Sequence, residues 1–154
     1  RTSTPPIRAS GTNPPPDSGG CLPETRMAHR SRLSGFIIDC NVDDLDAAAD
    51  FWAQALGSTV ADRDAGDETA DYQMLGDTPG DLHIEVQKVT HPSRVHLDIE
   101  TDDVDAEAGR LEKLGAKKIG FVKRWWVMEA PSGQRFCVVR TKYPDRGPAW
   151  NDWD

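Results

Sequence analysis

The chain has 154 residues and a mass of 17.0 kDa, which is the size of one ordinary domain or of two half-size modules that share a core. Its 26 Asp and Glu outnumber its 18 Lys and Arg, and the formal net charge is -8. A surface of this sign repels phosphate backbones, so we expect no nucleic-acid partner. No apolar run approaches the ~18 residues that a membrane-spanning helix needs, so we expect no membrane partner either.

The ends of the chain differ in composition from its middle. Residues 1–32 hold five Arg and two acidic residues, whereas residues 33–154 hold 13 basic and 24 acidic residues. Six of the eleven prolines lie before residue 24. Such a segment has too little apolar surface to offset the entropy of ordering it. We therefore predict a disordered or cloning-derived leader at 1–28, a folded domain at 29–142 and a C-terminal tail at 143–154.

Two further features bear on the tail and on the compartment. Trp150 and Trp153 in the tail suggest that this segment docks on the fold. The three cysteines, Cys21, Cys40 and Cys137, are odd in number and far apart. This pattern argues against a disulfide framework and favours a cytoplasmic location.

Between the ends, the first regular segment is a strand at 33–40. Asp43 and Asp44 then begin a helix, because acidic residues favour the positive end of the helix dipole. The helix spans 45–56, and Gly57 ends it. Three short strands follow near 58–63, 69–75 and 82–89, with Asp- and Gly-rich turns such as 64–67 between them.

The same order of elements then begins again. A strand at 94–100 precedes a helix that starts after Asp102 and Asp103 and ends before Gly115. Strands near 117–123, 125–130 and 135–141 complete the second copy. Residues 43–47 (DDLDA) match residues 102–106 (DDVDA) at an offset of 59. This repeat predicts an α+β fold of two paired βαβββ modules, at 33–89 and 94–141, forming a curved mixed sheet with a cup-shaped cleft.

Alternation along two of these strands selects candidate site residues. In the strand 94–100, His96 and Asp98 fall on the face opposite Val95 and Leu97. In the strand 82–87, Glu85 and Gln87 fall on the face opposite Ile84 and Val86. If the apolar faces meet the helices, these polar side chains line the cup. The alternative is that they are the solvated faces of ordinary antiparallel strands.

Trp125 and Trp126 are adjacent in one predicted strand, so one of the two should point into the cup. Together with Met128 or Phe121 it could form an apolar wall for a flat ligand, and Trp125, Trp126 and Met128 are the candidate ligand-binding residues. The alternative is an ordinary packed strand. An acidic cup with an aromatic wall favours a cationic or hydrogen-bond-donating aromatic ligand.

The sequence resembles the vicinal oxygen chelate superfamily, which includes glyoxalase I, bleomycin-resistance proteins and extradiol dioxygenases. The segments that carry the resemblance are 43–57 (DDLDAAADFWAQALG), 94–99 (RVHLDI) and 130–139 (APSGQRFCVV). The closest likeness is to small glyoxalase-like proteins. The resemblance implies the paired βαβββ fold, a homodimer, and in metal-bearing relatives four ligand positions, which fall here on Ile37, Glu85 or Gln87, His96 and Cys137.

Ile37 cannot bind a metal, and the thiol of Cys137 is a softer ligand than a carboxylate and suits zinc. The leading hypothesis is therefore a small-molecule-binding protein without a complete glyoxalase-type metal site and with no cofactor. The alternative is a metal-dependent lyase, isomerase or dioxygenase, with a divalent ion on His96, Glu85 and Cys137. His96 and Glu85 are the candidate catalytic residues, and a purely structural His96 is a third interpretation. The third class of function is a structural or partner-binding module, which would use the tryptophans of the tail.

Overall fold

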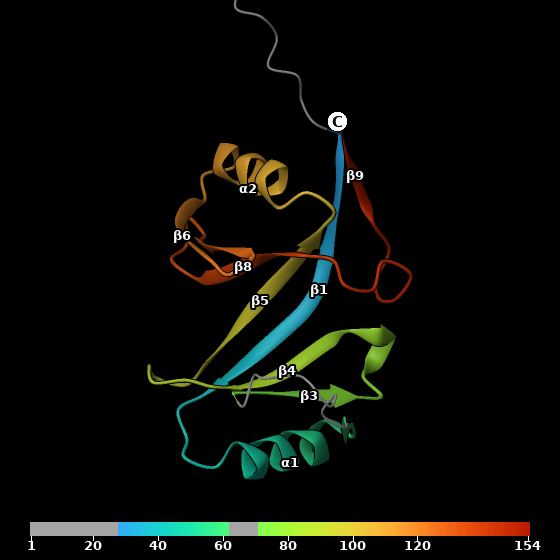
Figure 1. Cartoon of the computed structure of the whole chain (residues 1–154), viewed down its shortest axis with the longest axis vertical. Helices are drawn as coiled ribbons and strands as arrows, with labels where there is room; N and C mark the ends of the chain where they lie inside the picture. Colours follow the sequence, from blue (N-terminus) through green and yellow to red (C-terminus); the bar gives the residue numbers. More distant parts are fainter. Residues whose placement is uncertain (1–27, 62–70) are drawn as a thin grey trace, which may run out of the picture.

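The computed structural model describes residues 28–61 and 71–154, which form two α-helices and one nine-stranded mixed sheet (Figure 1). The first module comprises β1 (His29–Cys40), α1 (Leu45–Leu56), β2 (Thr59–Val60), β3 (Tyr72–Gly76), a 3-10 turn (Pro79–Asp81) and β4 (His83–Lys88). The second comprises β5 (Arg94–Thr101), α2 (Val104–Lys113), β6 (Lys117–Val122), β7 (Trp125–Glu129) and β8 (Arg135–Arg140), and β9 (Asn151–Trp153) follows. The predicted α+β fold of paired βαβββ modules is confirmed.

The two modules join along their first strands. The strand order is β2-β3-β4-β1-β5-β8-β7-β6, with β1 parallel to β4, β5 parallel to β8, and β1 antiparallel to β5. Ile37 pairs with His96 across the junction, and Asp39 pairs with Arg94 as Gly35 pairs with Asp98. The 59-residue offset of the repeat therefore relates Ile37 to His96 and Asp39 to Asp98, so the two aspartates occupy equivalent places on either side of His96.

The helices begin where the sequence predicts. Asp44 precedes α1 and its side chain accepts a hydrogen bond from the Ala47 N–H at 3.0 Å, and Asp103 precedes α2 and accepts from Asp105 and Ala106. Gly57 ends α1 in the left-handed conformation, at a φ of 67°, which costs glycine little because it has no Cβ.

Removal of either capping carboxylate should destabilise the protein modestly. We expect Asp44→Ala and Asp103→Ala each to lower the free energy of unfolding by about 1 kcal/mol, because each leaves N–H groups of the first helical turn without an acceptor. Urea unfolding followed by circular dichroism measures the change. Asp50→Ala, on the exposed middle of α1, is the control, and a loss as large in this variant would contradict a capping effect.

The helices cover the outer parts of the sheet and leave its centre bare on one face. α1 packs against β2, β3 and β4, and α2 packs against β6, β7 and β8 and also against β1 and β5. Figure 1 shows the two helices at opposite ends of the sheet, with β1 and β5 running between them. Val95 and Leu97 on β5 are accordingly 57% and 50% exposed. The expectation that the apolar face of this strand meets a helix is wrong for these two residues.

The C-terminal segment returns to the start of the fold. β1 begins at His29, four residues before the predicted strand, and β9 pairs with its first three residues. Trp153 donates a hydrogen bond to the Ser31 hydroxyl at 2.7 Å, and the Trp150 ring lies 4.0 Å from the Arg32 guanidinium carbon. Residues 29–32 (HRSR) show no apolar alternation, which is why the sequence pattern places the strand too late.

Some predictions lie outside the described residues. They are the leader as far as residue 27, the end of the strand predicted near 58–63, the turn at 64–67 and the start of the strand predicted at 69–75. Among the residues that are described, no helix is both long and apolar enough to span a membrane.

Candidate functional site

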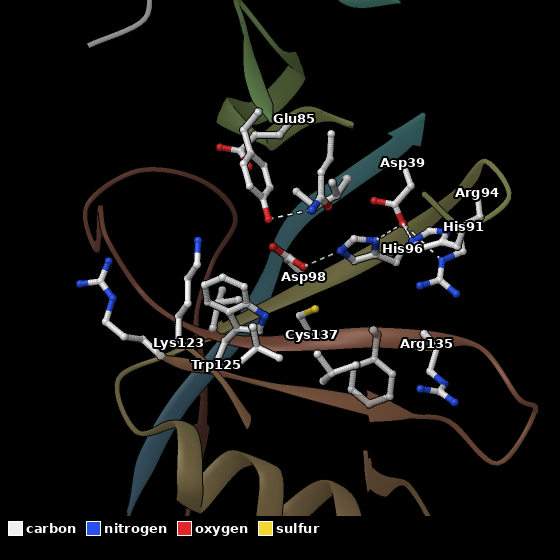
Figure 2. Close-up of a pocket in the computed structure, with 18 residues that line it drawn as sticks. Asp39, Glu85, His91, Arg94, His96, Asp98, Lys123, Trp125, Arg135 and Cys137 are labelled. Carbon is white, nitrogen blue, oxygen red and sulfur yellow. Dashed lines mark hydrogen bonds and ion pairs between the residues drawn. The ribbon is translucent and has the colours of Figure 1, made fainter. Parts of the chain in front are cut away.

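The concave face of the sheet encloses a pocket of about 500 Å³, to which both modules contribute (Figure 2). Its walls come from β1, β3, β4 and the loop after β4 in the first module, and from β5, β7, β8 and the β6–β7 turn in the second. The polar lining residues are Asp39, Tyr72, Glu85, Gln87, His91, Arg94, His96, Asp98, Lys123, Arg124, Arg135 and Cys137, and the apolar ones are Ile37, Val122, Trp125, Val127, Phe136 and Val139. We call this pocket the cup.

His96 lies at the floor of the cup and is held by Asp39. The His96 Nδ1 atom lies 2.9 Å from Asp39 Oδ2, and the Asp39 side chain is only 1% exposed. Burial alone would raise the pKa of Asp39, but the bond to His96 and the nearby Arg94 and His91 hold it below its usual value. An ionised carboxylate can only accept, so His96 donates this hydrogen bond from Nδ1.

Asp98 lies on the other side of the same imidazole. Its Oδ1 atom is 3.6 Å from His96 Nε2, and that oxygen is buried with no hydrogen-bond partner among the described residues. Burial raises the pKa of Asp98 to about 6, against the opposing effect of the neighbouring histidines. The imidazole is therefore flanked by two unlike carboxyl groups, one tightly bonded and one poorly solvated.

Cys137 enters the floor from β8, opposite Asp98 in the parallel ladder. Burial, reinforced by the negative charge of Asp98, raises the pKa of the Cys137 thiol to about 12. The thiolate is the nucleophilic form of cysteine. Cys137 is therefore a neutral thiol at neutral pH and is not activated as a nucleophile.

The first module supplies the opposite wall. Glu85 Oε1 lies 3.0 Å from His83 Nε2, and this bond raises the pKa of His83. Gln87 donates a hydrogen bond to the Tyr72 hydroxyl at 2.7 Å. Burial and the charge of Glu85 raise the pKa of Tyr72 to about 12, so this phenol stays protonated and can donate into the cup.

The two adjacent tryptophans point to opposite faces of the sheet. Trp125 lines the cup, as Figure 2 shows. Trp126 instead donates a hydrogen bond to Asp105 on α2, at 2.8 Å, and packs against Phe121. Met128 is fully buried in the core under α2. Trp126 and Met128 are therefore removed from the predicted ligand-binding set, because side chains alternate along β7 and α2 covers their face.

Comparisons with known proteins agree with this architecture. The sequence model of the family described as "Glyoxalase-like domain" matches residues 35–139. The chain belongs to this family. The glyoxalase-like fold is shared with a methylmalonyl-CoA epimerase of Streptomyces coelicolor, a single-residue variant in complex with 2-nitronate-propionyl-CoA. That structure is 20% identical at a TM-score of 0.52, over 72% of this chain and 97% of that one.

Two further structures show the same glyoxalase-like arrangement. The methylmalonyl-CoA epimerase of Mycobacterium tuberculosis is 16% identical at a TM-score of 0.50, over 70% of this chain and 88% of that one. A hypothetical protein of Bacillus halodurans C-125 is 12% identical at a TM-score of 0.53, over 73% and 95%. No curated protein matches the sequence. At these identities the structural likeness establishes the fold, which is that of the vicinal oxygen chelate superfamily.

One of the four metal-ligand positions that the resemblance implies is occupied by Ile37, whose side chain cannot bind a metal. Ile37 lies between Glu85 and His96, because β1 pairs with β4 on one side and β5 on the other. Its hydrocarbon side chain therefore separates the two donors, and Glu85 is paired with His83. The predicted metal set of His96, Glu85 and Cys137 is corrected: the donor atoms that converge, all within 4.8 Å of one another, belong to His96, Asp98 and Cys137.

Several residues that line this cup were not predicted from the sequence. Asp39 could have been found, because the 59-residue offset of the repeat carries Asp98 onto it. Arg94, Lys123, Arg124 and Arg135 carry no such signal, since lysines and arginines are usual on exposed strand ends and turns. Their presence also contradicts the expectation of an acidic cup, as the lining holds these four basic side chains and three carboxylates.

Proposed function

We propose that this glyoxalase-like protein binds a small organic molecule in the cup, and does so without a glyoxalase-type metal centre. The observation that carries the proposal is the pair of buried carboxylate oxygens at the floor, Asp39 Oδ1 and Asp98 Oδ1, which have no hydrogen-bond partner among the described residues. Buried polar atoms are almost always paired. A polar group of a ligand that donates hydrogen bonds to this floor would complete the pairing.

The lining supports a ligand with both a polar and an apolar part. His96 Nε2 and the Tyr72 hydroxyl provide further polar contacts at the floor and wall. Trp125 provides flat apolar surface in the same lining. A concave site with an apolar wall and few convergent polar groups is typical of small-molecule sites.

A ligand-observed NMR screen of small aromatic and carbonyl compounds, followed by protein-observed spectra with each binder, tests this function. We expect binders to shift the indole N–H resonance of Trp125, and we expect Trp125→Phe to weaken binding about threefold to tenfold through lost contact area. Trp126→Phe is the matched control, because its ring packs under α2 outside the cup. Equal loss in both variants, or no binder that shifts Trp125, would contradict a ligand site here.

A second candidate function is a metal-assisted lyase, isomerase or dioxygenase, and the convergence of His96, Asp98 and Cys137 favours it. These three side chains would hold the ion, and Asp39 would fix the imidazole through Nδ1, as carboxylates do for metal-binding histidines. A bound divalent ion polarises substrate oxygens. A stoichiometric divalent ion in the purified protein that is lost in His96→Ala would favour this function over the first.

The remaining expectations stay predictions. The homodimer and the cytoplasmic location follow from the resemblance and from the cysteine pattern respectively. The exposed Val95 and Leu97 at the centre of the sheet provide apolar surface that a second copy could cover.

A further inference from the structure

The lining of the cup has the opposite charge balance to the whole chain. Arg94, Lys123, Arg124 and Arg135 supply four positive charges to the lining, which holds three carboxylates. In the chain as a whole, acidic residues outnumber basic ones by 26 to 18. The cup is therefore a basic region in an acidic protein, which is the arrangement that attracts an anion from solution.

The carboxylates of the cup are largely compensated within it. Asp39 Oδ2 bonds to His96 at 2.9 Å and to Arg94 Nε at 3.3 Å. Glu85 is paired with His83 at 3.0 Å. Only Asp98, deep at the floor, lacks a cationic partner within hydrogen-bond distance in the described part of the cup. Since Arg94 and Arg135 are paired with Asp39 and Glu129, the uncompensated positive charge of the described lining comes from Lys123 and Arg124.

The basic side chains lie at two ends of the mouth. Figure 2 shows Arg94 and Arg135 at one end and Lys123 at the other, beyond Trp125. Arg94 and Arg135 contact Asp39 and Glu129 through Nε, so the terminal nitrogens of each remain as donors. Lys123 and Arg124 form no ion pair within the described part of the chain.

The backbone at Lys123 adds an independent indication. This residue has a φ of 50°, in the left-handed region, at the turn between β6 and β7. A non-glycine residue in this region costs free energy, and such residues cluster at functional sites. Glycine or asparagine adopts this conformation more readily, so Lys123 carries a conformational cost at this turn.

We propose that the ligand of the cup is a small organic anion, whose carboxylate or phosphate group contacts the basic mouth while its body lies against Trp125. This inference rests on the proposed binding function and names the class of its ligand. Charge-assisted hydrogen bonds from arginine and lysine are the interactions that select such groups. The floor, with its unpartnered carboxylate oxygens, then accepts from hydrogen-bond donors at the other end of the ligand.

Probes of one shape and different charge test the proposal. Benzoate, benzamide and benzamidine share a ring and a planar substituent, and phenyl phosphate distinguishes phosphate from carboxylate. We expect benzoate or phenyl phosphate to bind about fivefold more tightly than benzamide, since exposed ion pairs contribute modestly, and benzamidine to bind most weakly. Dissociation constants come from NMR titration of the Trp125 indole resonance, and the preference should shrink as salt is added.

Two double variants test whether Lys123 and Arg124 cause the preference for an anionic probe. Lys123→Gln with Arg124→Gln should lower benzoate affinity about threefold and leave benzamide affinity unchanged. Lys117→Gln with Lys142→Gln removes the same charge outside the cup and should change neither. Equal affinity for the three isosteric probes would overturn the anion inference while leaving the binding function intact. Failure of every probe to shift Trp125 would count against the binding function itself.

Discussion

Glu107→Ala is expected to lower the free energy of unfolding by about 3–5 kcal/mol, because it removes the acceptor of a buried ionic network. The Glu107 side chain is fully buried on α2. Its Oε2 lies 2.8 Å from both His29 Nε2 and Arg110 Nε, and its Oε1 accepts from Ser31 at 3.0 Å. The substitution leaves Arg110, whose side chain is only 17% exposed, without its carboxylate partner, which is why the cost exceeds that of a lost surface contact.

The pH dependence of the stability difference distinguishes loss of an ionic network from loss of side-chain packing. Burial alone would raise the pKa of Glu107, but bonds from Arg110, His29 and Ser31 hold it below its usual value of 4.5. A carboxyl group with a lowered folded pKa stabilises the protein above its unfolded pKa, and this stabilisation is lost as the pH falls through the folded value. The difference between wild type and Glu107→Ala should therefore be largest near pH 7 and shrink below pH 4.5.

Urea unfolding at several pH values measures both effects. Glu112→Ala is the matched control on α2, because Glu112 is 44% exposed and pairs with Lys118 on the surface. Its expected cost is below about 1 kcal/mol. Equal losses in the two variants, or a loss in Glu107→Ala that does not change with pH, would contradict a buried ionic network.

The same network shows why part of the fold could not be predicted from the sequence. Both helices and the core strands follow from capping aspartates, glycine stops and apolar periodicity, which are local signals. The start of β1 and the whole of β9 depend instead on pairs far apart in the chain, such as His29 with Glu107 and Ser31 with Trp153. No local pattern encodes these contacts, so the sequence indicated only that the tryptophan-containing tail docks.

The candidate site could likewise be predicted only where local sequence patterns determine it. Strand alternation placed His96, Asp98 and Glu85 on one concave surface, because the side-chain period of a strand is fixed. Alternation could not decide which face of β7 the helix α2 covers, so it left Trp125 and Trp126 equivalent. It also could not show that Glu85 pairs with His83 rather than facing His96, since that choice belongs to side-chain rotamers.

Asp98→Asn is expected to stabilise the protein by about 2 kcal/mol at pH 8, although it alters a residue of the cup. The folded pKa of Asp98, about 6, lies above the usual 3.8 because burial penalises the charged form. A carboxyl group with a raised folded pKa contributes most to stability below pH 3.8, and that contribution falls as the pH rises towards 6. An asparagine never ionises, so the gain should appear across this window and stay constant above it.

Asp39→Asn is the matched control, because the repeat relates Asp39 to Asp98 and both flank His96. Asp39→Asn should change the free energy of unfolding in the opposite direction to Asp98→Asn. The pKa of Asp39 is lowered, so its charge stabilises the fold above pH 3.8, and the amide should destabilise the protein most at neutral pH. Thermal unfolding from pH 3 to 8 in a chelating buffer measures both curves. Destabilisation by both variants at pH 8 would contradict the conclusion that burial penalises the ionised form of Asp98.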